Sequence, residues 1–302
     1  MKTQFASAFA ALTAASLLTG CVSASHVGAF SQAASQAATQ VANGFNQVQE
    51  TTVTRKLSDV ASGTEGPTDA TFAGLLDAKT ELAPRLDCLS EINNYAASLG
   101  SLANANYRKD IDAAAASLYG ALNGLAATYQ KATASSLPGS ADDTAIIATA
   151  VDAIGNAIAE YKRQAALRKI ILQTDPAIQA VCADLEKTFT ELGQDHFVYQ
   201  NLNSEVADMT GYYNQQTTKW NYEQRLQYLD RIRQTRQVRD GSETFVTSAA
   251  HSVAALAKAH KALADAASHG KLTSAEVVQA VGELADEATK AKQFYDQLHA
   301  KN

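Results

Sequence analysis

Arginine and aromatic residues gather in one stretch of this 302-residue chain, and they are the residue types best suited to binding chemistry. Sixty residues are alanine, yet none lies between 208 and 248. At 100° per residue, the arginines of this stretch fall mostly within a helical arc of about 120° that also holds apolar side chains. Rigid aromatic rings and forked guanidinium groups are typical of recognition surfaces. The candidate binding face consists of Tyr222, Arg225, Leu229, Arg233, Arg236 and Arg239.

Two interpretations of this face are open. As a binding surface, it would contact a protein or an anionic group such as a lipid or cell-wall phosphate or carboxylate. As a structural surface, it would cross neighbouring helices, with its arginines paired to acids such as Glu223 and Asp230.

Residues for metal binding or catalysis are sparse. His251, His260 and His269 repeat every nine residues, a spacing that turns neighbouring histidines to opposite sides of a helix, so we interpret them as solvated. The chain has no H-E-x-x-H, G-x-S-x-G, P-loop or G-x-G-x-x-G motif. We therefore predict no catalytic residue, no metal ligand and no cofactor, and we expect the protein not to be an enzyme.

The N-terminus carries a distinctive motif. Lys2 precedes an uncharged run over 5–18 that is too short to span a bilayer. Residues 18–21 then read Leu-Thr-Gly-Cys. This segment resembles the signal peptide and lipobox of bacterial lipoproteins, in which lipid is attached to the cysteine and the chain is cut before it. The resemblance implies that 1–20 are removed and that Cys21 carries the lipid; an ordinary secretory signal is the alternative.

The lipoprotein resemblance also implies a location. Val22, rather than aspartate, follows Cys21, which resembles the default for sorting to the outer membrane, so we expect a protein anchored there and facing the periplasm. Without Lys2, 24 basic residues face 31 acidic ones, a formal net charge of −7. Export and this negative charge argue against a nucleic-acid partner.

Two further cysteines would lie in an oxidising compartment. A bridge between Cys88 and Cys182 would close a loop of about 95 residues and stabilise the fold by about 4–5 kcal/mol. We favour this disulfide over two buried free thiols. There is no C-x-x-C motif that would indicate a redox site.

Composition and periodicity predict long helices. Only 7% of residues are aromatic and four are proline, which argues against an all-β domain. Apolar residues recur at helical steps, with a near-heptad repeat over 178–220 and turns at 240–242 and 269–270. The predicted helices cover about 30–62, 68–102, 105–135, 141–173, 178–239, 243–268 and 271–298.

These features predict an all-α fold: an elongated bundle of long antiparallel helical hairpins with coiled-coil-like packing. We divide the chain into a signal peptide (1–20), a short lipid-anchored tether (21–27) and a helical bundle domain (28–302). We expect a cell-envelope interaction or structural protein, with a protein partner, self-association or an anionic envelope component.

Two other functions are alternatives. The hairpin of 113–129 and 144–159 is poor in charge and contains Gly120-x-x-x-Gly124, so the protein could instead be membrane-active, like helical pore-forming proteins. It could also sense a ligand through the region 196–239.

Overall fold

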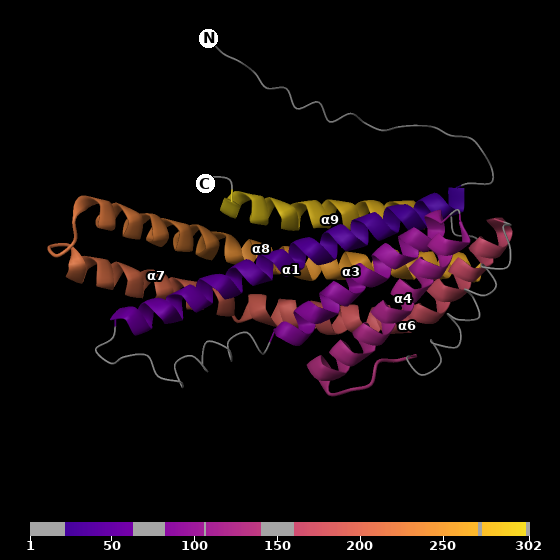
Figure 1. Ribbon diagram of the computed structural model, residues 1–302, viewed down its shortest axis with the longest axis horizontal. Helices are drawn as coiled ribbons and strands as arrows, with labels where there is room; N and C mark the ends of the chain where they lie inside the picture. Colours follow the sequence, from indigo (N-terminus) through magenta and orange to yellow (C-terminus); the bar gives the residue numbers. More distant parts are fainter. Residues whose placement is uncertain (1–21, 63–81, 106, 140–159, 271–273, 300–302) are drawn as a thin grey trace, which may run out of the picture.

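The helical periodicity of the sequence corresponds to seven α-helices in a computed structural model that describes residues 22–62, 82–105, 107–139, 160–270 and 274–299. No strand occurs in these ranges. The helices form an elongated bundle (Figure 1), which confirms the predicted all-α fold class. They are α1 (Val22–Ser62), α3 (Ala83–Asn104), α4 (Arg108–Thr133), α6 (Glu160–Gln194), α7 (Phe197–Gln216), α8 (Tyr222–Ser268) and α9 (Ala275–His299).

The main core lies where α1 crosses α3, α6, α8 and α9. Phe45 of α1 stacks on Phe189 of α6, with ring centroids 4.6 Å apart, and meets Phe245 of α8 at 5.0 Å. Phe245 in turn stacks on Phe294 of α9 at 4.5 Å. Gly44 makes room for this layer, because a Cβ there would overlap the ring of Phe245. Large rings and small neighbours thus hold four helices together.

Alanine forms the seams between these aromatic layers. Ala33, Ala34, Ala37 and Ala38 of α1 are buried, as are six alanines of α8 between residues 249 and 267. Small side chains let helix backbones approach closely, so that each residue of the seam contributes little apolar area but allows dense packing.

The predicted turn at 240–242 is wrong, because α8 continues through it as one helix of 47 residues. Gly241 is needed for packing rather than for a turn: a Cβ there would lie 2.6 Å from the ring of Phe294. Ser242 is buried and donates to the carbonyl of Arg239 at 2.7 Å, a bond that helices tolerate.

The predicted helix over 178–239 is in fact interrupted twice. His196 breaks it between α6 and α7 by adopting a left-handed conformation, with φ of 49°. Residues 217–221 then reverse the chain into α8. The heptad positions were largely correct as core positions, since Ile178, Leu185 and Phe189 are buried, but the continuity was not.

Pro176 does not end a helix, contrary to our prediction. The sequence indicated a stop before Asp175, yet Pro176 lies inside α6 on its exposed side. There the hydrogen bond that proline removes can be replaced by water. Pro84 lies in the first turn of α3, where proline is well tolerated. The predicted helix over 141–173 lies largely outside the described residues.

The predicted tether (21–27) overlaps the start of α1. Cys21 lies outside the described residues, but α1 begins at Val22 and Val27 is completely buried. The helical bundle therefore starts one residue after Cys21.

The predicted disulfide is not formed. Cys88 and Cys182 are both buried free thiols. Cys88 on α3 faces α4, where its Sγ donates to Thr128 Oγ1 at 3.4 Å, so it does not point toward Cys182 on α6. Burial raises the pKa of Cys88 to about 11 and raises the pKa of Cys182 as well, which keeps both thiols protonated and unreactive.

The first half of the predicted apolar hairpin packs against the core. On α4, Leu118 and Leu125 are fully buried, and a Cβ at Gly124 would contact Glu91 of α3, whereas Gly120 faces open space. Within the described ranges, no helix has the length and apolar character needed to span a bilayer. The second half, 144–159, lies outside the described residues.

Candidate partner-binding surface

The α7–α8 hairpin forms one end of the molecule, and α1 begins at the opposite end (Figure 1). We call residues 197–240 the arm. The arm has a small core of its own, made of Met209, Tyr228 and Ile232, and this core is separate from the main one. A peripheral hairpin with its own core can present a surface without disturbing the bundle.

Aromatic side chains fix the turn at the tip of the arm. Trp220 lies 5.0 Å from Tyr228 and 5.6 Å from Tyr212, measured between ring centroids, and Tyr213 borders the same cluster. The first turn of α8 is closed by a capping box: Asn221 Oδ1 accepts from the Gln224 backbone at 2.9 Å, and Gln224 Oε1 accepts in return at 3.0 Å. The tip is therefore rigid.

Apolar side chains form an exposed stripe on the outer side of α8. Tyr222, Leu226 and Leu229 are 73%, 53% and 44% exposed, and their spacing of four and three residues puts them on one helical face. With Phe197, they make up half of the large apolar side chains that the described residues expose. The sequence prediction included Tyr222 and Leu229 but missed Leu226, although its position four residues after Tyr222 could have identified it.

The arginines of the predicted face divide into two groups. Arg239 is only 19% exposed; it binds Asp240 at 2.7 Å and Asn203 at 3.1 Å and lies over the ring of Tyr199. Arg239 therefore joins α7 to α8, as the structural interpretation expected. Arg225 is half-buried, whereas Arg233 and Arg236 are exposed.

The two exposed arginines differ in their partners. Arg233 binds Asp230 at 2.6 Å and Gln237 at 3.0 Å. Arg236 makes no hydrogen bond or ion pair with any residue that the structure describes. Exposed ion pairs on one helix contribute about 0.3–0.5 kcal/mol, so the side chain of Arg233 can also be redirected at little cost.

A groove of about 450 Å³ runs between the two helices of the arm. Thr210, Tyr213 and Asn214 line it from α7, and Leu229, Ile232, Arg233 and Arg236 line it from α8. The structure thus brings three residues of the predicted face together at the groove, namely Leu229, Arg233 and Arg236. Tyr222 lies at the start of the same helix.

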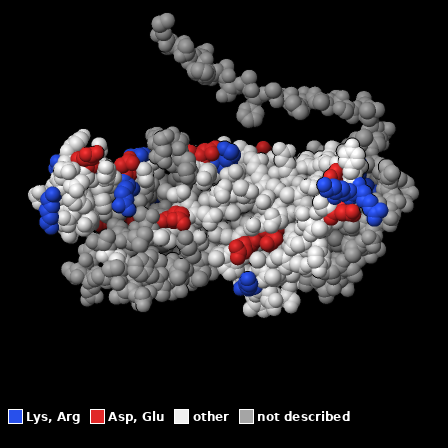
Figure 2. Space-filling view, viewed as in Figure 1, with Lys and Arg blue, Asp and Glu red and all other residues white. Residues whose placement is uncertain are grey.

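The α8 side of the arm is basic, whereas the α7 side adds Glu205 and Asp208 and no basic residue, so the six basic and five acidic residues of the arm give a net charge of +1. Residues 217–240 contain six basic and three acidic side chains, while the whole chain has a formal net charge of −6. Basic side chains gather beside acidic ones at this end of the molecule (Figure 2). An anionic partner is therefore attracted to this end.

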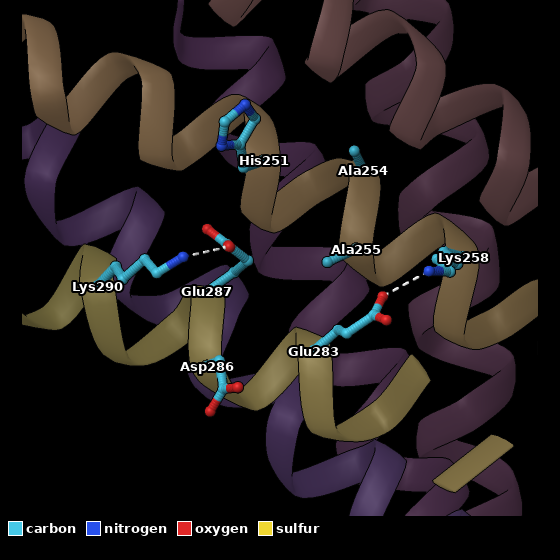
Figure 3. A pocket seen from close by; sticks show the side chains of 8 residues that line it. All are labelled: His251, Ala254, Ala255, Lys258, Glu283, Asp286, Glu287 and Lys290. Atoms are coloured by element: carbon cyan, nitrogen blue, oxygen red, sulfur yellow. Dashed lines mark hydrogen bonds and ion pairs between the residues drawn. The ribbon is translucent and has the colours of Figure 1, made fainter. Parts of the chain in front are cut away.

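A second hollow lies between α8 and α9 (Figure 3) and has a volume of about 380 Å³. Four of its charged groups are already paired: Lys258 binds Glu283 at 2.5 Å and Lys290 binds Glu287 at 2.6 Å. The hydrogen bond from Lys258 is the main cause that lowers the pKa of Glu283. Three residues suitable for one metal ion do not come together anywhere in the described residues.

Sequence analysis missed a buried polar network around His260, which is not solvated but 0% exposed. Its Nδ1 is 2.9 Å from Asp175 Oδ1, and its Nε2 is 2.8 Å from the hydroxyl of Tyr95. That hydroxyl also bonds Thr174 at 2.8 Å. His260 lies four residues after Leu256 and three before Leu263 on the apolar stripe of α8, a position that could have indicated burial.

The network is suited to structure rather than to catalysis. Burial alone would raise the pKa of Asp175. Hydrogen bonds from His260 and Gln179, together with the charges of His260 and Lys261, lower this pKa below its usual value. An Asp–His pair can orient an imidazole for proton transfer, but both nitrogens of His260 are engaged and no solvent reaches the ring. The network instead joins α3, α6 and α8 in one register.

No protein family matches the chain, and neither a curated protein nor a solved structure matches it. The geometry of the arm and of the core is therefore the basis for assigning a function.

Proposed function

We propose that this protein is a lipoprotein of the bacterial cell envelope that binds a partner through its arm. The lipobox-like segment ending at Cys21 supports the anchor. The exposed stripe of Tyr222, Leu226 and Leu229 beside Arg233 and Arg236 supports the binding role.

The exposed stripe is the observation on which the binding role depends. Large apolar side chains that lie next to one another on a surface mark interaction sites more often than scattered ones do. Tyrosine and arginine are the residues that most often dominate binding energy. A hairpin held by its own aromatic core keeps these side chains in place before binding, which reduces the entropy lost on association.

The anchor is tested by replacing Cys21 with serine. We expect the wild-type protein to sediment with membranes and to carry a diacylglycerol-modified N-terminal Cys21, detected by mass spectrometry. We expect Cys21→Ser to lose both properties. A soluble wild-type protein cut at another position would contradict the anchor.

The binding surface is tested by chemical crosslinking in the cells that produce the protein. Replacing Tyr222, Leu226 and Leu229 with serine should reduce the crosslinked partner about tenfold. A control variant carries Leu172→Ser and Val278→Ser, which remove exposed apolar side chains from α6 and α9 and should leave crosslinking unchanged. Equal crosslinking by both variants would show that the arm is not the binding surface.

A further inference from the structure

The groove of the arm has two chemically different parts. Its floor is apolar, with Tyr213 on α7 and Ile232 on α8, and its α8 rim carries Arg233, Arg236 and, at one end, Asp240, whose carboxylate is already bound by Arg239. The opposite rim, from α7, is polar and uncharged, with Thr210 and Asn214. An occupant must therefore be apolar on one side and acidic on one flank.

The two arginines are placed to bind carboxylates. They lie three residues apart on α8, so their positions differ by one helical turn, about 5 Å along the axis. Arg236 has no ionic partner among the described residues, and the pair of Arg233 with Asp230 is exposed. Carboxylates one turn apart on a second helix match this spacing.

The length of the groove also fits a helix. Its α8 side extends from Leu229 to Asp240, which corresponds to about 17 Å, or three helical turns. Amphipathic helices bind grooves of this kind by placing side chains at i, i+3, i+4 and i+7 on an apolar floor.

The groove lies far from the anchoring lipid along the bundle, given an anchor at Cys21. Phe30 of α1 contacts His260 of α8, and Phe45 of α1 contacts Phe245 of α8. The numbers rise along α1 as they fall along α8 by the same amount, so α1 and α8 run antiparallel in a constant register. Extending this register puts Val22, where α1 begins, level with the C-terminal end of α8. Arg236 is then about 50 Å farther along the bundle, and the bundle follows Cys21 without a tether.

We propose that the groove binds an acidic amphipathic helix of a partner protein that lies about 50 Å from the anchoring lipid. This inference rests on the proposed function and specifies its partner. The carboxylates of that helix pair with Arg236 and Arg233, and its apolar side chains cover Tyr213, Leu229 and Ile232.

The test uses the full chain with a photocrosslinking amino acid at Asn214, on the groove rim, or at Tyr222, on the tip. The crosslinked peptides are identified by mass spectrometry in the native cells. We expect the Asn214 product to contain a helical segment with apolar residues on one face and acids one turn apart. Arg236→Glu should reduce this product at least tenfold, whereas Arg236→Lys should retain most of it.

Arg231→Glu is the matched control. Arg231 is also exposed on α8, but it lies over the ring of Tyr228 and outside the groove, so its reversal should leave the Asn214 product unchanged. Thermal unfolding of each variant shows whether the fold is retained.

The outcomes separate this inference from the proposed function. Crosslinking of Asn214 to lipid, to glycan, to a second copy of the chain or to a segment without acids would overturn the inference, and so would a product unaffected by Arg236→Glu. If Tyr222 still crosslinks to a protein in such a case, the arm remains a binding surface. If neither position crosslinks to any molecule, both proposals fail.

Discussion

The core around His260 and the arm around Tyr228 differ in the partners of their tyrosine hydroxyls and in the exposure of their apolar side chains. In the core, the hydroxyl of Tyr95 has partners in Thr174 and His260, and alanine fills many of the seams between helices. In the arm, the hydroxyl of Tyr228 is buried without a hydrogen-bond partner among the described residues, and three large apolar side chains face solvent. Buried polar atoms without a partner in the described ranges also occur outside the arm, for example Ser252 Oγ, so the two regions differ chiefly in the apolar side chains that the arm exposes, as binding surfaces do.

The largest expected effect is in the core. Asp175→Ala removes the partner of a fully buried histidine, so it should lower the free energy of unfolding by about 3 kcal/mol. Lys261→Ala is the control, because Lys261 is exposed and 3.6 Å from Asp175, and it should change stability by less than about 0.5 kcal/mol. Urea unfolding measures both. Equal effects would mean that the network does not stabilise the core.

The same site predicts a pH dependence. Folding lowers the pKa of Asp175, so its ionised carboxylate stabilises the folded protein. This stabilisation is fully present at pH values above the pKa of Asp175 in the unfolded chain, about 4, and is lost as the pH falls through its lower pKa in the folded protein. The stability difference between wild type and Asp175→Asn should therefore shrink below about pH 4. A difference that stays constant from neutral to acidic pH would contradict this.

An intermediate effect is expected from two glycines. Gly44→Ala places a Cβ against the ring of Phe245, which should cost about 1–3 kcal/mol by overpacking. Gly120→Ala in α4 meets no neighbouring atom and should stabilise the protein by about 0.5–1 kcal/mol because alanine favours helix. Thermal unfolding compares the two; destabilisation of similar size at both positions would argue against close packing at Gly44.

Removing one hydroxyl gives the sharpest comparison of the two regions. Tyr95→Phe leaves Nε2 of His260 without a partner and removes one of the partners of Thr174, which should cost about 1–3 kcal/mol, whereas Tyr228→Phe should be neutral or stabilising by up to about 1 kcal/mol. Urea unfolding of both variants provides the measurement. A clear loss of stability in Tyr228→Phe would show that its hydroxyl has a partner after all.

The smallest effect is expected from reduction. Since Cys88 and Cys182 are separate buried thiols, dithiothreitol should leave the Tm unchanged, and neither thiol should react with iodoacetamide at pH 8 while the protein is folded. A Tm that falls by several degrees on reduction would restore the disulfide that the sequence suggested.

Local sequence signals predicted much of this fold. Apolar spacing identified core residues such as Phe45 and Phe189, and the ends of α1 and α8 lie next to the predicted breaks at Gly63 and Gly270. Interactions between distant residues accounted for the errors. Gly241 signals a turn locally, but Phe294 of another helix needs the space in front of it.

The candidate site was predicted in part for the same reason. Helical spacing alone was sufficient to group Arg233, Arg236 and Leu229. It could not show that Arg239 faces α7, because its partner Asn203 lies 36 residues earlier in the chain. Nor could it predict the break at His196, whose imidazole binds Glu243, 47 residues away.

The direct start of α1 at Val22 has a mechanical consequence. With lipid on Cys21, as proposed, the bundle is a stiff rod joined to the membrane by almost no flexible chain. Tilting about this pivot and diffusing in the plane are then its main motions, and the tip of α8, 47 residues from the far end of that helix, sweeps a shell with a radius of about 70 Å. Confinement to this shell raises the local concentration of the tip within about 70 Å of the anchoring lipid and excludes the tip from greater distances. The rod would thus limit its partners to molecules within this reach before any side chain makes contact.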